Sequence, residues 1–370
     1  MTFETVNLII MCMGLAFSVL LFYRFPKLPL PDDESDSPAV SIIIPARDEE
    51  ENLKLLLKDL QTQSLRPLEI ICANDDSSDG TAKVAQSFGV TLINLPNKPA
   101  GWTGKTWACQ NGADLATGSF LLFLDADVRL RQAGLSRLMR AYQNCQCTIS
   151  VQPFHKTNRL HEQLSLVFNL VQIAANGTTL PWKTTIGVHG PVLLISKADY
   201  DKIGGHESVR QFVVEDMAFG QKLRERQLPF QLFMGDEDVS YRMYSGGLRS
   251  LLEGWIKNFA VGAAKTPVAA FIMAFFWLGS MANVPFYLIH AAVVSDNQPM
   301  IIAYGLLYLL WVIVISVLAR KIGSFQQLPI IFFPVLSIGF MIIFFLSLVS
   351  KILGLPVKWK GRVVTGENQV

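Results

Sequence analysis

Two aspartates, Asp125 and Asp127, close an apolar run near the middle of the chain. The residues before them, LLFL at positions 121–124, are typical of a buried strand. Because an unpaired charge inside a core costs several kcal/mol, we expect both carboxylates at an open strand end. There they suit a cation, a polar ligand or only solvent.

Two more polar clusters follow apolar runs in the same way. Arg47, Asp48 and Glu49 come after the strand-like run 40–44 and Pro45, and NDDSSDGT at 74–81 comes after the run 68–73. Taken alone, the second cluster has the composition of a turn or a helix cap. Three polar clusters at the ends of three strands nevertheless predict one functional pocket.

The segments around these clusters alternate between strand and helix patterns. Strands are predicted at 40–44, 68–73, 90–95 and 120–124, and helices at 49–60, 81–88 and 105–115. This alternation indicates an α/β fold, with a mostly parallel sheet that carries helices on both faces. Such sheets bind ligands at the carboxyl ends of their strands, which is where the polar clusters lie.

The composition indicates a membrane protein. Of the 370 residues, 51% are hydrophobic, and the net charge of +2 gives no case for nucleic acid. The basic residues Arg24 and Lys27 favour a cytoplasmic globular domain in a multi-pass protein of the cell membrane. Four stretches are long and apolar enough to span a bilayer: 6–23, 267–294, 300–318 and 328–349. Basic residues flank the last stretch on both sides, so the sequence leaves open whether it crosses or re-enters.

We therefore divide the chain into six parts. They are an N-terminal transmembrane anchor at 1–28, a linker at 29–38, a globular α/β domain at 39–245, an amphipathic helix at 246–265, C-terminal transmembrane segments at 266–350 and a basic tail at 351–370. The amphipathic helix carries Leu251, Leu252 and Trp255 on one face. That face lies in the membrane interface or packs against the globular domain.

The five cysteines are scattered along the chain. Cys145 and Cys147 are one residue apart, but no second pair completes a zinc site. We expect free, reduced thiols, as is usual in a cytosolic domain.

The polar clusters carry a resemblance to a known family. SIIIPARDEE at 41–50, EIICANDDSSDGT at 69–81, DAD at 125–127 and VVEDMAFGQKLRE at 213–225 agree in order and spacing with its motifs. The sequence resembles the inverting GT-A glycosyltransferases of family 2 over about residues 41–232. Asn74 and Asp76 depart from the usual second motif, where the family carries aspartate and glycine. The resemblance implies a GT-A Rossmann-like domain that uses a nucleotide-diphosphate sugar.

The resemblance also implies roles for individual residues. Asp127 is expected to bind Mg²⁺ or Mn²⁺, and Asp216 to act as the general base beside Glu215. If the acceptor is a carboxylic acid, which is already ionised at pH 7, Asp216 would orient it instead. Lys105 is expected to contact the diphosphate of the donor or, equally, to be a solvated lysine at a helix start. Contacts to the UDP-sugar are expected from Pro45, Ala46, Glu49, Asp75, Lys105, Asp125 and Arg242.

The C-terminal half resembles a narrower group. RMYSGGLRSLLEGWIK at 242–257, GSF at 323–325 and VKWKGR at 357–362 look like segments of bacterial carotenoid glycosyltransferases of staphyloxanthin-like pathways. This implies UDP-glucose as donor and a carotenoid carboxylic acid as acceptor. The alternatives are another lipid (diacylglycerol, a hopanoid, a ceramide-type lipid or polyprenyl phosphate) and a non-catalytic nucleotide-sugar sensor. The sugar, the metal and the oligomeric state stay open.

Overall fold

The computed structural model describes residues 3–31, 38–182, 187–212, 214–266, 268–295, 297–353, 357–359 and 362–364. The chain forms two compact units. The α/β unit comprises Pro26–His155, Gly187–Met243 and Pro356–Val370. The helical unit comprises Met1–Phe25, Lys156–Ile186 and Tyr244–Leu355.

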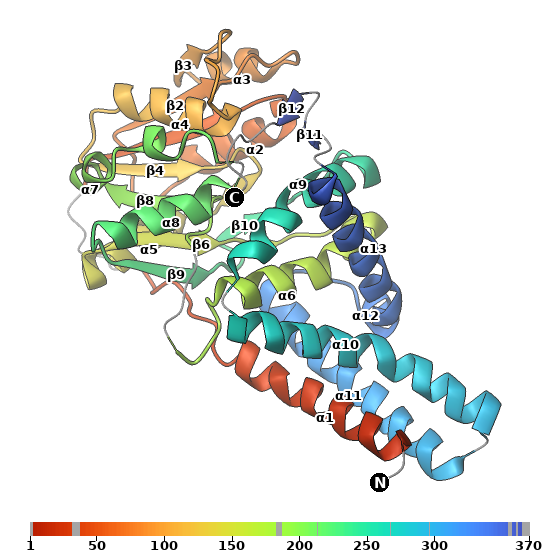
Figure 1. The fold of residues 1–370 in the computed structure, drawn as a ribbon. Helices are drawn as coiled ribbons and strands as arrows, with labels where there is room; N and C mark the ends of the chain where they lie inside the picture. The colour runs from red at the N-terminus through yellow and green to blue at the C-terminus, as the bar shows by residue number, and fades with distance from the viewer. Residues whose placement is uncertain are drawn as a thin grey trace. The chain divides into compact units, whose positions relative to one another are not determined.

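A seven-stranded sheet organises the α/β unit (Figure 1). Its order is β3-β2-β1-β4-β8-β6-β9. Strand β8 is antiparallel to both of its neighbours, whereas the other pairs in the sheet are parallel. The predicted mostly parallel sheet is therefore confirmed. The strands are β1 (Val40–Ala46), β2 (Glu69–Asn74), β3 (Thr91–Asn94), β4 (Phe120–Leu124), β6 (Thr148–Gln152), β8 (Val192–Ser196) and β9 (Phe230–Met234).

Helices cover both faces of this sheet, because alternate side chains of each strand point to opposite faces. In β1, Ile42 and Ile44 enter one apolar core together with four of the five leucines of α2, and Ile43 enters the other core with residues of α4 and α8. The helices of this unit are α2 (Glu50–Gln61), α3 (Thr81–Ser87), α4 (Gly104–Leu115), α5 (Gly134–Cys145), α7 (Lys197–Lys202) and α8 (Glu215–Glu225), with a 3₁₀ turn η2 (His206–Val209).

Two smaller sheets complete the unit. The first has the order β5-β10-β7, formed by β5 (Val128–Leu130), β10 (Val239–Tyr241) and β7 (Phe154–His155). It begins immediately after Asp127 and ends immediately before Arg242, so it holds both residues in place. The second sheet is an antiparallel pair in the basic tail, β11 (Val357–Trp359) and β12 (Arg362–Val364).

The segment Pro26–Pro29, which we call the N-terminal strap, covers the edge strand β9. The backbone N–H of Met234 donates to the carbonyl of Pro26 at 2.7 Å, and Lys27 Nζ donates to the carbonyl of Gly235 at 2.5 Å. An edge strand presents unpaired backbone groups, and the strap occupies some of them here. Of the predicted linker 29–38, residues 32–37 lie outside the described residues.

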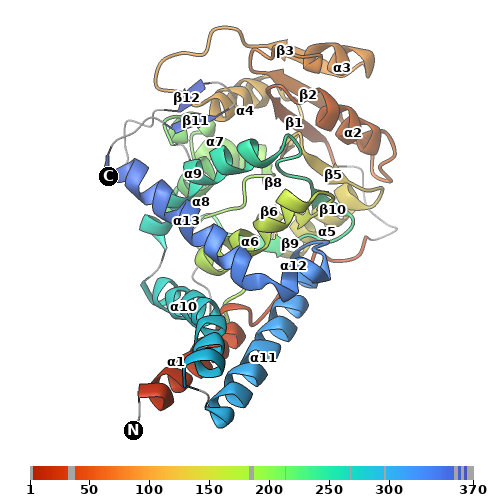
Figure 2. The same cartoon turned by 90° about the vertical axis from the view of Figure 1, so that its right-hand side faces the viewer.

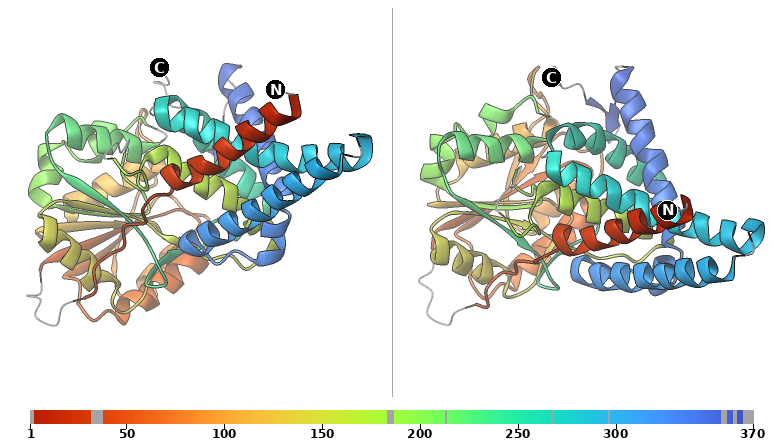
Figure 3. Two further views of the ribbon diagram at one scale, coloured as in Figure 1. Left: turned by 90° about the horizontal axis from the view of Figure 1, so that it is seen from below. Right: turned by 60° about the horizontal axis from the view of Figure 1, so that its bottom comes forward.

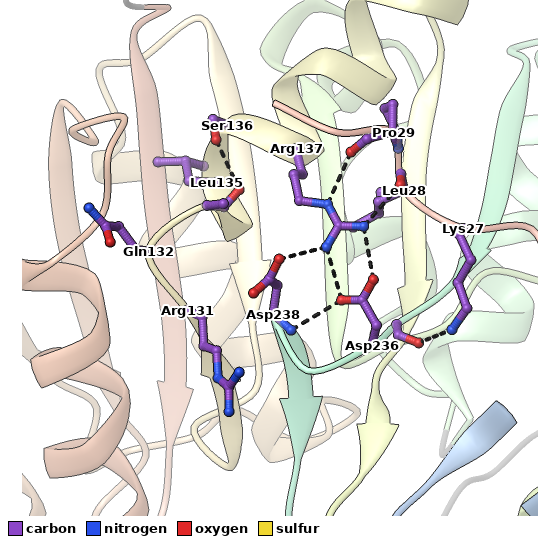
Figure 4. A network of polar contacts seen from close by, with 12 residues as sticks. Lys27, Leu28, Pro29, Arg131, Gln132, Leu135, Ser136, Arg137, Asp236 and Asp238 are labelled. Carbon is purple, nitrogen blue, oxygen red and sulfur yellow. Dashed lines mark hydrogen bonds and ion pairs between the residues drawn. The ribbon is translucent and has the colours of Figure 1, made fainter. Parts of the chain in front are cut away.

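The buried side chain of Arg137 on α5 fixes the strap (Figure 4). Its guanidinium donates to the carbonyls of Leu28 at 2.9 Å and Pro29 at 3.0 Å. It also pairs with Asp236 at 2.9 Å and with Asp238 at 2.7 Å. One cation thus joins the strap, α5 and the turn that leads into β10.

The helical unit contains four helices that are long and apolar enough to cross a membrane. They correspond to the four predicted spans, and lie at Glu4–Leu21, Val268–Val294, Gln298–Ile322 and Phe333–Ser350. Three of them, α1 (Phe3–Leu21), α10 (Val268–His290) and α11 (Gln298–Ile322), run side by side (Figures 2 and 3). The predicted span 328–349 is broken at Phe332 into α12 (Gln327–Ile331) and α13 (Phe333–Ile352).

Small and polar residues join α1 to α10. Trp277 Nε1 donates to Ser18 Oγ at 2.8 Å, and Ser280 Oγ donates to the carbonyl of Met11 at 2.7 Å. A Cβ on Gly14 would lie 2.2 Å from Ser280 Cβ, so only glycine permits this approach. Close packing through small residues is typical of helices in membranes.

A short apolar helix, α6 (Ser165–Asn176), belongs to the helical unit although it follows the first part of the α/β unit in sequence. Phe168 on α6 stacks on Trp255 of α9 (Leu248–Lys265) and packs edge-on against Phe340 of α13. Leu251 and Trp255 are buried. Within its own unit, the predicted amphipathic helix therefore packs against α13 and, through Trp255, against α6.

The prediction of five free thiols is wrong for one pair, because Cys145 and Cys147 form a disulfide. Helix α5 ends at Cys145, and Gln146 takes a left-handed conformation with φ 48°. That turn leaves the two Cα atoms 5.2 Å apart, a normal separation for a disulfide. Among the described residues, Cys12, Cys72 and Cys109 are free.

Candidate active site

The first wall of the site is formed where β1 and β2 end. The parallel register aligns Ala46 with Asn74, and the backbone N–H of Asp75 donates to the carbonyl of Ala46 at 2.9 Å. Arg47 Nη1 donates to the carbonyl of Asp75 at 2.6 Å. Three residues that the sequence groups as contacts to a UDP-sugar, Pro45, Ala46 and Asp75, therefore lie together.

The buried carboxylate of Asp75 faces the start of α4. A Cβ built on Gly104 would lie 2.2 Å from Asp75 Oδ2, so the side chain occupies the space that glycine leaves. Thr103 caps the helix by accepting from the backbone N–H of Thr106. The first turn of α4 and the end of β2 thus form one continuous surface.

The loops after β1 and β2 hold each other in place. Asp48 Oδ1 accepts from the backbone N–H of Ser78 at 2.7 Å, and the N–H of Glu49 donates to Thr81 Oγ1 at 2.9 Å. Asp79 in turn accepts from the N–H of Thr81 at 3.0 Å. The turn interpretation of NDDSSDGT is thus correct for several of its side chains, and these contacts fix the loop that carries Asp75.

The centre of the site is an ion-paired cluster around Lys105. Its ammonium lies 2.7 Å from Asp125 Oδ1 and 3.1 Å from Glu215 Oε1. These residues come from the first turn of α4, the end of β4 and the first turn of α8. Burial raises the pKa of Asp125 despite the opposing effect of Lys105, and the carboxylates of Glu215 and Glu49 add to the rise. Glu49 thus belongs to the same electrostatic cluster.

Asp216 lies next to Glu215 at the start of α8. Its Oδ1 accepts from the backbone N–H of Met217 at 2.8 Å. Burial, followed by the neighbouring Glu215 carboxylate, raises the pKa of Asp216 to about 7. A carboxylate with a pKa near neutrality is suited to accept a proton from a bound group.

Asp127 and Arg242 meet beside the small sheet β5-β10-β7, where the backbone N–H of Arg242 donates to the carbonyl of Asp127 at 3.3 Å. Within the residues described, no group of three His, Cys, Asp or Glu side chains could hold a metal by itself. Mg²⁺ is usually held by one or two carboxylates together with phosphate oxygens of a ligand. Asp127, with Asp125 two residues away, fits that kind of shared site.

A pocket opens at this cluster, within the α/β unit. Its polar rim holds Lys105, Asp125, Glu215 and Asp216, and its other lining residues are Pro45, Cys109, Phe123, Val188, Gly190, Leu193, His206 and Phe219. Burial lowers the pKa of His206 to about 3, so its imidazole is neutral at pH 7. His189 is buried in the same way, with its pKa lowered to about 3, in line with a core role.

Sequence reasoning missed two glycines and one pairing. A Cβ on Gly104 would lie 2.2 Å from Asp75 Oδ2, and a Cβ on Gly190 would lie 3.2 Å from Lys105 Nζ and 3.5 Å from Asp216 Oδ2. Gly104 precedes Lys105 in the segment GWTGKT at 101–106, and no local pattern there marks it as a neighbour of Asp75. The ion pair between Lys105 and Glu215 joins residues 110 positions apart, and no local pattern marks it.

Comparison with known proteins identifies the family of the chain. Residues 41–203 match the family model "Glycosyl transferase family 2". The chain is 33% identical over 362 residues to the 4,4'-diaponeurosporenoate glycosyltransferase of Staphylococcus aureus (strain USA300), with 96% of each chain covered. The chain belongs to glycosyl transferase family 2. The counterpart from strain MRSA252 is also 33% identical, over 363 residues.

A solved structure of the same fold is a mannosyltransferase from Pyrobaculum calidifontis in complex with GDP-Man and Mn²⁺. The TM-score is 0.52 at 16% identity, and the match covers 85% of this chain and 98% of that one. At this identity the similarity establishes the fold, which is the GT-A architecture expected from the four motifs of this family-2 member.

Proposed function

We propose that this family-2 enzyme is a membrane-bound, inverting glycosyltransferase that moves one hexose from a UDP-sugar to a lipid acceptor. The favoured donor is UDP-glucose, and the favoured acceptor is a carotenoid carboxylic acid. The observation that carries the proposal is the similarity over 96% of the chain to a protein named for a carotenoid acid. The cluster of Lys105, Asp125, Glu215 and Asp216 at the sheet edge supports it.

In this proposal the donor lies along the ends of β1, β2 and β4. Asp75 contacts the uracil in the space beside Gly104, with Pro45, Ala46 and Glu49 lining the same edge. Asp125 contacts the ribose and Arg242 the diphosphate. Asp127 would hold Mg²⁺ or Mn²⁺, whose chemistry is to neutralise the charge on the departing diphosphate.

The reaction is a single displacement at the anomeric carbon. An acceptor oxygen forms the new bond while the bond to the diphosphate breaks, and UDP leaves with the electron pair. With a hydroxyl acceptor, Asp216 takes the proton as general base. A carboxylate acceptor brings no proton at pH 7, so Asp216 then orients it, and Glu215 holds Lys105 at 3.1 Å.

A lipid acceptor accounts for the membrane segments. Four described helices are long and apolar enough to cross a bilayer, and we propose a multi-pass protein of the cell membrane with its α/β unit in the cytoplasm. Helix α9 begins at Leu248, soon after Arg242 in the chain, and its Leu251 and Trp255 are buried within the helical unit.

The test uses the purified full-length protein in lipid vesicles with Mn²⁺ or Mg²⁺. Labelled UDP-glucose or UDP-galactose is supplied with a C30 carotenoid acid or with diacylglycerol, and an Asp127→Ala variant runs beside each reaction. We expect label from UDP-glucose in the carotenoid fraction and none with the variant. Label in diacylglycerol alone would replace the acceptor, and donor binding without transfer to any lipid would indicate a sensor instead of an enzyme.

A further inference from the structure

The ammonium of Lys105 lines the pocket together with the carboxylates that hold it. Asp125 lies against it with both oxygens, Oδ1 at 2.7 Å and Oδ2 at 3.0 Å, and Glu215 Oε1 lies at 3.1 Å. The carbonyl of Gly190, at 3.5 Å, is at the outer limit of a hydrogen bond. An ammonium carries three N–H donors, and its contact with the protein is weakest on the side of Gly190.

Lys105 and Asp216 border the same small space above Gly190. A Cβ built on Gly190 would lie 3.2 Å from Lys105 Nζ and 3.5 Å from Asp216 Oδ2. An acceptor whose attacking oxygen contacts Asp216 is therefore also within reach of the ammonium. The lysine thus stands beside the place where the new bond forms.

The charge balance of the pocket decides which acceptors can enter. Three carboxylates line it, those of Asp125, Glu215 and Asp216, and Lys105 is the one cation among its described lining residues, since His206 is neutral. An ionised acceptor would be repelled by these carboxylates unless a positive charge met it. The apolar side chains that form the rest of the pocket strengthen such an ion pair by lowering the local dielectric constant.

The lysine keeps its charge under all physiological conditions. Burial acts to lower the pKa of Lys105, but the carboxylates of Asp125 and Glu215 outweigh that effect and raise it well above the ordinary value. A hydroxyl acceptor has no use for this permanent charge, whereas a carboxylate acceptor needs it.

We propose that Lys105 binds the carboxylate of the acceptor and so selects carboxylic acids over alcohols. This inference rests on the proposed function, because it assigns the acceptor subsite of the same reaction. The ammonium donates to one acceptor oxygen while the other oxygen attacks the sugar. Asp125 and Glu215 hold the ammonium in position before the acceptor arrives.

The experiment compares two acceptors of the same length, a C30 carotenoid acid and the corresponding C30 alcohol, with the full-length protein in lipid. The variants are Lys105→Gln and Lys105→Arg. The control is Lys197→Gln, since Lys197 bonds the carbonyl of Ala113 at the opposite end of α4. For each protein we measure kcat and KM for both acceptors, the inhibition constant of UDP, and Tm.

We expect Lys105→Gln to raise the KM for the acid about tenfold or more, with the KM for the alcohol and the inhibition by UDP changed less than about twofold. Lys105→Arg should recover part of the affinity for the acid, because it keeps the positive charge. This variant still tests the inference if the glutamine variant folds poorly. The control should match the wild type.

Other results overturn the inference in distinguishable ways. If Lys105→Gln weakens the inhibition by UDP and lowers kcat/KM equally for both acceptors, Lys105 would be assigned to the donor diphosphate. Equal losses of kcat with a lower Tm and unchanged KM values would leave it a structural residue. If the wild type glycosylates the alcohol and not the acid, both this inference and the proposed carotenoid-acid function are wrong.

Discussion

Replacing Asp216 with asparagine separates the two roles that this carboxylate can have. A general base contributes roughly 10²–10⁴-fold to a rate, so Asp216→Asn should reduce transfer to a carotenoid alcohol by that factor. A carotenoid acid arrives ionised, and we expect the same variant to reduce its transfer by less than about tenfold. The two substrates share their apolar chain, so the difference between the two rate losses measures the contribution of proton removal.

The pH dependence follows from the pKa of Asp216, which is raised to about 7. With the alcohol, the wild-type kcat should fall about tenfold for each pH unit below 7 as the base is protonated, and should level off above 7. With the acid, that limb should be missing. The asparagine variant should lack this limb with both acceptors.

Stability provides the control for this experiment. Because the folded-state pKa of Asp216 exceeds the usual value of 3.8, the folded protein binds more protons than the unfolded chain between about pH 4 and 7. The contribution of Asp216 to stability therefore decreases as the pH rises through that window. Asp216→Asn removes the ionised form, so its Tm at pH 8 should equal or exceed that of the wild type.

The result that would refute the reasoning is a loss of 10²-fold or more with the carotenoid acid, at unchanged Tm. Asp216 would then be essential to a reaction that needs no base, and its role would have to be the positioning of the sugar or of Lys105.

Three further substitutions test other parts of the structure. Asp127→Asn should lower kcat at least about 100-fold and raise the Mn²⁺ concentration for half-maximal activity; unchanged metal dependence would move the metal site elsewhere. Gly104→Ala should raise the KM for the UDP-sugar several-fold, because the added Cβ would lie 2.2 Å from Asp75 Oδ2. Its Tm should stay unchanged, because helix propensity favours alanine. A KM equal to that of the wild type would remove Asp75 from the donor site. Arg137→Met should lower the free energy of unfolding by about 2–4 kcal/mol, as measured by urea denaturation. The control Arg131→Met, which breaks an exposed pair with Glu237, should change it by less than about 0.5 kcal/mol. Equal effects of the two substitutions would contradict the role of Arg137.

The elements around the candidate site were predictable because their patterns are local. The predicted strand 40–44 is β1 (Val40–Ala46), and the predicted helix 49–60 is α2 (Glu50–Gln61), which buries leucines at helical spacing, Leu53, Leu56, Leu57 and Leu60. The parallel sheet followed from the alternation of these patterns. The family was identifiable for the same reason, since each of its motifs is a short segment at a strand end or helix start.

Three features escaped prediction because they depend on length, on the backbone conformation of one residue or on distant contacts. Helix α6 has 12 residues, too few for a membrane span, so its apolar sequence gave no sign that it packs among the membrane helices. The disulfide of Cys145 depends on the left-handed conformation of a single residue, Gln146. The pairing of Lys105 with Glu215 depends on the fold as a whole.

The N-terminal strap has a consequence for how the protein folds during its synthesis. Lys27 and its partner Gly235 are separated by 208 residues, and β9 is the last strand along the chain to join the large sheet. The strap is therefore synthesised early, but it cannot bind β9 until nearly the whole domain has been synthesised. Contacts between such distant residues slow folding, and an uncovered edge strand pairs readily with other chains. A chain shortened to start at Val40, the first residue of the sheet, would leave β9 open, whereas one that keeps Pro26 onward carries its own cover.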